Sequence, residues 1–300
     1  MKYPITAYFL NITLAASALL ASCGGEKAPV EVMPDEEKTV TEETSVLKVD
    51  DRLIVLPSPV QMSGLIQKSG AAFKKDLLSS TANSTKYTTV FQQAMNMGVY
   101  GADAGYASAF GQSQVAMDYM GAVGKLSDQL DLNAAFGNDI IQGLKAGGSK
   151  EAMMGLVATA YKSCDELLDK NERTDVAAMI AAGAWIESMY CAVEAYKASK
   201  SQALSNCIGD QKSTLNNLIS LISGSFKRDE QPDFANVVDT LSYIAQEYNN
   251  VYATYNYVAT TDDAGNKKST INSTNEVTIK EETIERISAY LTGLRQKITN

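Results

Sequence analysis

Apolar residues recur every three or four positions along most of the chain from residue 58 onward. This is the repeat of one face of an α-helix, so the pattern predicts helices joined by short polar connections. Ser58-Pro59 is typical of a helix start, and Gly147-Gly148 of a helix end. The predicted helices cover residues 58–78, 86–110, 112–130, 133–145, 149–170, 174–197, 201–226, 232–252 and 278–298.

The stretch before the last helix has a different pattern. Residues 258–261 and 267–271 contain threonine and other β-branched residues, and residues 262–266 between them have the composition of a turn. They predict a small β-ribbon. With about eight helices and short connections, residues 52–300 are expected to form a single all-α domain. We expect a multi-helix bundle of stacked antiparallel hairpins, with the ribbon before the C-terminal helix.

The first residues have the pattern of an export signal. Lys2 precedes an apolar run over residues 5–20, which is too short for a membrane span of about 20 apolar residues. The run ends in Leu20-Ala21-Ser22-Cys23, which resembles the lipobox of bacterial lipoproteins. The resemblance implies that residues 1–22 are a signal peptide, and that Cys23 becomes a first residue carrying diacylglycerol and an acyl group such as palmitate. The alternative is an ordinary signal peptide that contains a cysteine.

Residues 23–51 have the composition of a tether. Residues 24–51 hold nine acidic side chains against three lysines. Such a segment buries too little apolar surface to offset its loss of conformational entropy, so a flexible acidic leash is predicted. Gly24, rather than aspartate, follows the cysteine. By resemblance to lipoprotein sorting signals, this favours a cell-envelope protein anchored in the outer membrane, on either its periplasmic or its surface face.

Composition excludes several classes of chemistry. The net charge of −9 offers no basic footprint for nucleic acid. The chain has no histidine, which removes serine–histidine triads and histidine-ligated zinc or haem. The sequence also lacks the glycine loops that bind phosphate, the nucleophile elbow and the calcium loop. We therefore expect no cofactor and no metal, and any catalysis would depend on carboxylates, tyrosines, lysines or serines.

Three cysteines lie in the predicted helical domain, and export would place them in an oxidising compartment. Cys191 and Cys207 are equidistant from Ser199, near the expected turn between two antiparallel helices. They would lie at the same height if both faced inward. The sequence therefore allows either a Cys191–Cys207 disulfide, with Cys164 left over, or three buried thiols that pack as small apolar groups.

Residues 95–124 are rich in glycine and alanine inside helical patterns. Each interior glycine weakens a helix by about 1 kcal/mol relative to alanine, so some other interaction must offset it. One interpretation is the close approach of two helices across small residues. The other is a smooth wall that admits a ligand, for which Tyr100, Asp103 and Tyr106 are the candidate binding residues.

Other aromatic positions are open to two interpretations. Tyr248, Tyr252 and Tyr255 are spaced to share one helix face, either as core packing or as a surface that stacks on sugars or peptides. In the longest apolar helix, Trp185 is expected in the core and Glu187 in solvent.

Together these features resemble a group of uncharacterised helical envelope lipoproteins of Bacteroidota-type bacteria. The strings that carry the resemblance are the Leu-Ala-Ser-Cys box, Leu56-Pro57-Ser58-Pro59, Gly98-Val99-Tyr100-Gly101-Ala102-Asp103, Asn171-Glu172-Arg173-Thr174-Asp175, and the ribbon followed by a helix. The resemblance implies a location and a fold but no chemistry.

Two classes of function follow. The first is a non-enzymatic binding or accessory module, held at the membrane by its lipid and contacting an envelope protein or a ligand. The alternative is an enzyme that uses carboxylates and tyrosines on cell-wall or glycan substrates. A cleft with two carboxyl groups about 5 to 10 Å apart, one of them with a raised pKa, would favour the enzyme. A closed surface with an exposed apolar patch would favour the module.

Overall fold

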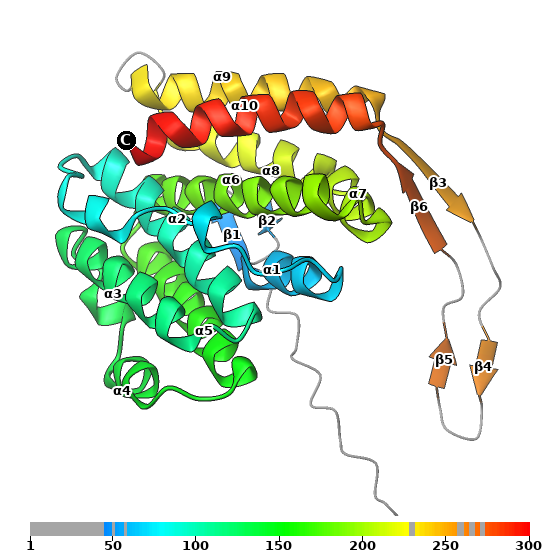
Figure 1. The fold of residues 1–300 in the computed structure, drawn as a ribbon. Helices are drawn as coiled ribbons and strands as arrows, with labels where there is room; N and C mark the ends of the chain where they lie inside the picture. The colour runs from blue at the N-terminus through cyan, green and yellow to red at the C-terminus, as the bar shows by residue number, and fades with distance from the viewer. Residues whose placement is uncertain are drawn as a thin grey trace, which may run out of the picture. The chain divides into compact units, whose positions relative to one another are not determined.

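The computed structural model describes residues 45–49, 52–56, 59–227, 232–256, 261–263, 268–270 and 274–300. The expected signal peptide, Cys23 and most of the expected tether lie outside these residues. The described chain is mostly helical, so the predicted all-α class is confirmed (Figure 1).

Ten α-helices lie within the described ranges, with short 3-10 turns between some of them. The α-helices are α1 (Pro59–Lys68), α2 (Val90–Ala109), α3 (Ser113–Gln129), α4 (Asn138–Ala146), α5 (Lys150–Lys170), α6 (Thr174–Ser199), α7 (Gln202–Gly209), α8 (Gln211–Ser225), α9 (Pro232–Glu247) and α10 (Glu281–Thr299). The 3-10 turns are η1 (Lys75–Leu77), η2 (Thr81–Thr85), η3 (Asn133–Ala135) and η4 (Tyr248–Asn250). The helix predicted over residues 201–226, for which Gly209 suggests a bend, is divided at Asp210 into α7 and α8.

Helix α6 is the centre of the core. Its most extensive contact is with α2, and α1, α5, α7, α8 and α10 also contact it. Buried residues occur on all sides of α6, which is typical of a helix surrounded by other helices. By length and apolar composition α6 would be able to cross a membrane, but 89% of its most apolar window is buried inside the fold. The same composition is expected of a core helix, so this is weak evidence for a membrane span.

The segment between α1 and α2 is irregular where the sequence predicted helix. The predicted helix over residues 58–78 ends at Lys68, and Gly70 has φ +81°, in the left-handed region that glycine tolerates. Residues 69–89 then contain only η1 and η2 before Thr89 begins α2 with a capping box to Gln92. We call residues 69–89 the strap.

Six strands lie among the described residues, in three antiparallel pairs. The strands are β1 (Ser45–Val49), β2 (Arg52–Leu56), β3 (Tyr252–Asn256), β4 (Thr261–Asp263), β5 (Lys268–Thr270) and β6 (Thr274–Thr278). β1 pairs with β2, β3 with β6 and β4 with β5. β1 falls within residues 23–51, where a leash without regular structure was expected.

The end of α9 and the start of α10 differ from the prediction. Helix α9 ends at Glu247, so the proposed helical face of Tyr248, Tyr252 and Tyr255 does not form. Tyr252 instead lies in β3 opposite Thr278 of β6. Threonine and tyrosine suit a strand, and the two asparagines before them favour a turn over a helix. Because Thr278 is held in this pair, α10 begins at Glu281 and not at residue 278 as predicted.

Candidate functional site

The three predicted ligand-binding residues lie together, and the strap occupies the place where a ligand was expected. Tyr100, Asp103 and Tyr106 are three residues apart on α2, so they share one helix face, and all three are buried. The Tyr100 hydroxyl donates to the Ser80 carbonyl at 2.8 Å. The Ser79 amide donates to Asp103 Oδ2 at 3.0 Å, and the Lys74 amide donates to the Tyr106 hydroxyl at 3.2 Å.

Tyr119 of α3 and Phe73 complete the attachment of the strap. The Tyr119 hydroxyl donates to the Ser79 carbonyl at 2.6 Å, so both backbone groups of Ser79 are bonded to buried side chains. The Phe73 ring stacks on Tyr106 with ring centroids 5.5 Å apart. Burial raises the pKa of both Tyr100 and Tyr119, so their hydroxyls keep their protons and remain donors. An irregular segment must find partners for its backbone, and here α2 and α3 supply them.

Behind the strap lies a buried charge cluster that joins three distant parts of the chain. Arg295 of α10 donates from Nε to Glu187 Oε2 at 2.6 Å and from Nη2 to Glu187 Oε1 at 2.8 Å. The same Nη2 reaches the Leu77 carbonyl and the Ser79 hydroxyl, each at 2.8 Å. The Glu187 side chain is fully buried, and that of Arg295 is 15% exposed. A two-pronged arginine–carboxylate contact of this kind is both strong and strongly oriented.

Asp103 adds a second carboxyl group to this cluster. Burial is the largest cause that raises the pKa of Asp103 well above its ordinary value, and the charge of Glu187 and a hydrogen bond to Glu187 raise it further. Asp103 Oδ1 is buried and has no hydrogen-bond partner in the structure. The raised pKa favours a protonated Asp103, which accepts from the Ser79 amide through Oδ2 and lies close to Glu187. The proton on Asp103 and the positive charge of Arg295 then compensate the charges of the two buried carboxyl groups.

The same two carboxyl groups also affect the pKa of Arg295. Burial by itself lowers the pKa of the Arg295 guanidinium, but its hydrogen bonds to Glu187 and the neighbouring negative charge outweigh burial and raise the pKa. The guanidinium also lies over the Tyr190 ring, 4.3 Å from the ring centroid, which stabilises the cation further.

Three side chains of metal-ligand type meet in this cluster. The ligand atoms of Asp103, Glu187 and Cys191 lie within 4.8 Å of one another, and all three residues are buried. Both oxygens of Glu187, however, already accept from Arg295. A cation placed there would meet the guanidinium charge and displace its hydrogen bonds, so the residues fit a shared proton better than a metal ion.

Of the two alternatives that the sequence left open for the cysteines, the structure has the buried thiols and not the disulfide. Cys164, Cys191 and Cys207 are all free and buried. The two expected partners have different neighbours, since Cys207 Sγ lies 3.3 Å from the Met62 sulfur of α1, whereas Cys191 faces the Asp103–Glu187 pair. Equal distance from a turn sets the height of a residue on a helical hairpin but not the direction of its side chain, so equal height does not bring Cys191 and Cys207 together. Burial raises the pKa of Cys164 to about 12 and that of Cys207 to about 11.

Gly98 of α2 allows the backbones of α2 and α6 to pack closely. A Cβ atom on Gly98 would lie 2.0 Å from the Ile180 carbonyl oxygen of α6, and one on Gly183 would lie 1.9 Å from the Met95 carbonyl oxygen. The α2 and α6 backbones therefore touch through reciprocal glycines. Gly101 has a different role, because a Cβ there would meet the Tyr161 hydroxyl at 2.2 Å.

Sequence reasoning missed two members of the cluster. Glu187 was expected in solvent but is fully buried, whereas Trp185 is in the core as predicted. Arg295 was not singled out at all. A signal for both was present, because Glu187 is the only acid in the middle of α6, and Arg295 lies one turn after Leu291 and one turn before Ile298 on the buried side of α10. Two opposite charges at apolar positions are expected to pair.

Comparison of the chain with protein-family models, with curated proteins and with solved structures gives no match. The function is therefore argued from the residues of this chain. Its most polar interior site is filled by its own strap and its own arginine, and that is the arrangement any function has to accommodate.

Proposed function

We propose that this protein is a lipid-anchored envelope protein that acts as a non-enzymatic binding or accessory module. The anchor is inferred from Lys2, the apolar run and the Leu20-Ala21-Ser22-Cys23 box, followed by an acidic leash. Two or more acyl chains would hold such a protein on a membrane stably. Export to the outer membrane is part of this proposal.

The observation that supports a non-enzymatic role is that the carboxyl groups of Asp103 and Glu187 are enclosed in the fold. Asp103 and Glu187 are both fully buried; Asp103 accepts a hydrogen bond from the strap, and Glu187 accepts two from Arg295. A carboxyl group has to reach its substrate in order to transfer a proton to it. In this arrangement the pair stabilises the fold and holds the strap.

The surface of α9 and α10 supports contact with a protein partner. Tyr243 and Tyr290 are 52% and 37% exposed, and their rings stack with centroids 6.0 Å apart. Arg286 beside them is paired with Glu247 at 2.7 Å. Tyrosine and arginine are enriched in protein interfaces, because they offer large rigid contact areas with polar ends. An accessory module would use this face to bind an envelope protein.

The enzymatic alternative rests on one specific observation, the raised pKa of Asp103 beside Glu187. Acid–base pairs of glycan hydrolases have such a pKa, with carboxyl groups about 5 Å or more apart around an open cleft. Here the carboxyl oxygens lie within 4.8 Å and both are enclosed. This alternative therefore requires the strap to leave. Release of soluble products from peptidoglycan by the wild-type protein, lost in Asp103→Asn, would favour it.

The anchor is tested by Cys23→Ser. We expect the wild-type protein in the membrane fraction, extracted by detergent, and the variant in the soluble fraction or with its signal uncleaved. Membrane retention of the variant with an unmodified terminus would contradict the anchor.

The binding role is tested by crosslinking in intact cells, with capture of the tagged protein and mass spectrometry. A reproducible envelope partner, lost in the double variant Tyr243→Ala/Tyr290→Ala, would support it. Leu65→Ser is the matched control, because Leu65 is a 48% exposed apolar residue on α1, away from this face. A partner retained equally by both variants would contradict the assigned surface.

A further inference from the structure

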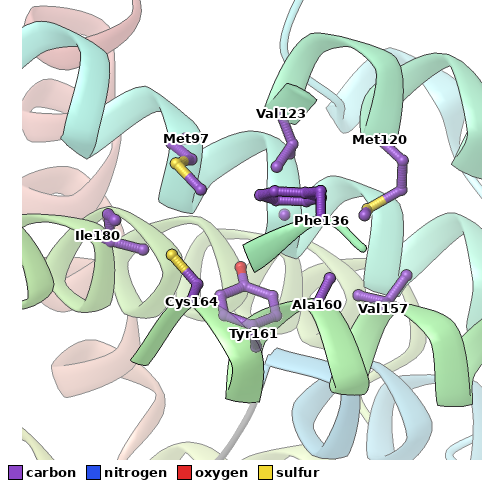
Figure 2. Close-up of a pocket in the computed structure, with 10 residues that line it drawn as sticks. Met97, Met120, Val123, Phe136, Val157, Ala160, Tyr161, Cys164 and Ile180 are labelled. Atoms are coloured by element: carbon purple, nitrogen blue, oxygen red, sulfur yellow. The ribbon is translucent and has the colours of Figure 1, made fainter. Parts of the chain in front are cut away.

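The apolar pocket between α2, α3, α5 and α6 leaves little room for a ligand. Figure 2 shows the Phe136 ring between Val123 and Tyr161. The space that remains is about 20 Å³, which holds about one or two water molecules. This space is a packing gap and not a binding site. The outer surface offers a better candidate, which is the unpaired edge of strand β3.

Strand β3 has a partner strand on one edge only. It pairs antiparallel with β6, from Tyr252 opposite Thr278 to Asn256 opposite Thr274, without a bulge. Within the parts of the chain that the structure describes, no second strand pairs with β3. Tyr252 is 66% exposed, and Thr254 is exposed as well. The other edge of β3 therefore presents backbone N–H and C=O groups with which a further strand would pair.

The two strands of this ribbon differ in what covers them. Strand β6 contacts α7, and its Val277 is buried there against Gly209. The exposed residues of β3 lie on the open side of the ribbon. A two-stranded ribbon is at best marginally stable alone, and three or more strands are usually needed. A strand added to β3 would therefore stabilise the ribbon at the edge that the body does not cover.

The edge of β3 also lacks the features that usually prevent strands from joining edge to edge. Such edges normally carry a lysine or another charge, a proline or a bulge. Residues 248–261, which include β3, contain no charged side chain and no proline. Strands β4, β5 and β6 each contain at least one charged residue. β3 is thus the strand of this region that can accept another strand without bringing a charge into the contact.

We infer that β3 pairs with β3 of a second copy of this chain, so that the two β3–β6 ribbons form one four-stranded sheet. Two copies that meet through the same edge of the same strand pair antiparallel across a two-fold axis. With Thr254 on the axis, Tyr252 lies opposite Asn256 of the second copy, and all five residues of β3 are paired. The inference does not depend on the lipid anchor or on the surface of α9 and α10.

Charge favours a second copy as the occupant. A two-fold axis brings identical side chains close together, so any charge on β3 would face its own copy and repel it. The five residues of β3 are tyrosine, alanine, threonine, tyrosine and asparagine, and none of them is charged. Paired threonines, which this register places on the axis, are favourable across antiparallel strands.

The direct contact is tested with Thr254→Cys in the full-length chain, oxidised in intact cells and analysed on a non-reducing gel. We expect a disulfide-linked dimer, because the residue on the two-fold axis meets its own copy. Leu65→Cys is the matched control for random collisions, since Leu65 is 48% exposed on α1. The wild type shows any dimer that its own cysteines make. A dimer yield no higher than that of Leu65→Cys would overturn the inference, and so would a disulfide to a different protein.

A charge placed on the axis tests the pairing of the strands. Two full-length copies with different tags are expressed together, and one tag is captured in detergent. Thr254→Lys in both copies should lower co-capture about tenfold, because like charges then face each other. Thr254→Lys in one copy with Thr254→Glu in the other should restore it, a rescue that would not follow if either variant failed to fold. Thr278→Lys in both copies is the control, since Thr278 is exposed on β6, which takes no part in the contact.

The co-capture experiment contradicts the inference in three cases. The wild-type copies do not capture each other, Thr254→Lys in both copies leaves capture unchanged, or the opposite charges fail to restore it. Loss of capture with Thr278→Lys equal to that with Thr254→Lys would assign the contact to β6 and would also overturn it.

Discussion

Arg295 and Glu187, 108 residues apart in the sequence, meet through two hydrogen bonds of 2.6 and 2.8 Å inside the core. The contact ties the C-terminal helix α10 to the central helix α6 and, through Leu77 and Ser79, to the strap. Removal of one partner from a buried pair leaves the other charge without compensation, which is usually more damaging than removal of both.

Arg295→Met should therefore destabilise the protein by about 3–5 kcal/mol, measured as the free energy of unfolding in urea. The double variant Arg295→Met/Glu187→Gln should recover part of this loss, because no unpaired carboxylate remains buried. Arg286→Met is the matched control, since Arg286 pairs with Glu247 on the surface, and it should change the unfolding midpoint little. Equal effects of the two arginine variants would contradict the proposed role of Arg295.

Asp103→Asn should change how stability depends on pH. The raised pKa of Asp103 means that the folded protein holds a proton which the unfolded chain releases above its ordinary pKa of about 3.9. Raising the pH from there toward the folded-state pKa therefore favours unfolding, by at most about 1.4 kcal/mol per pH unit. An asparagine amide can donate to Glu187 at every pH, so the variant should lack this decline.

The measurement is the free energy of unfolding at pH 5, 6, 7 and 8 for the wild type and for Asp103→Asn. Asp118→Asn, at an exposed position of α3, controls for the loss of a negative charge. Parallel curves for the wild type and Asp103→Asn would show that Asp103 holds no extra proton in the folded state.

Gly98→Ala should destabilise the protein by about 1–3 kcal/mol, because the new methyl group has to push the α2 and α6 backbones apart. Gly121→Ala is the opposite case, since Gly121 is exposed in the middle of α3 with no heavy atom within 4 Å of the added Cβ. That variant should be more stable by about 0.5–1 kcal/mol. Thermal melting of both variants checks the prediction, and a stabilised Gly98→Ala would refute the close contact.

Much of the helical pattern was predictable from the sequence, and the polar contacts were not. Apolar spacing identified α2, α3, α5 and α6 because each buries a face or its whole surface against neighbours. The strap was predicted as helix in part, because spacing cannot show that Ser79 bonds to side chains from α2 and α3 instead of its own chain neighbours. Tyr100, Asp103 and Tyr106, the candidate ligand-binding residues, lie together on α2, and in the structure they bond to the strap.

Glu187 shows a second limit of prediction from the sequence, which concerns whether a charged side chain is buried. A charged residue flanked by apolar ones can face either solvent or a partner, and the choice depended on Arg295, more than 100 residues away. Local sequence alone does not contain that information.

The thiol content should distinguish three free buried thiols from a Cys191–Cys207 disulfide with one thiol left over. Cys164, Cys191 and Cys207 are free and buried, and burial raises the pKa of each. In the Cys23→Ser background, we expect almost no reaction with a thiol reagent in the native state. After unfolding without reductant, all three thiols should react. Reaction of a single thiol would instead show that Cys191 and Cys207 are joined.

The carbonyls at the end of α10 accept from residues encoded some 200 positions earlier. The Thr299 carbonyl accepts from Asn83 and Tyr87, and the Ile298 carbonyl accepts from Asn96. A ribosome makes Asn83 long before Thr299, so these hydrogen bonds, and the Arg295–Glu187 pair with them, can form only once α10 has been synthesised. The core therefore closes only after residue 299 has been synthesised.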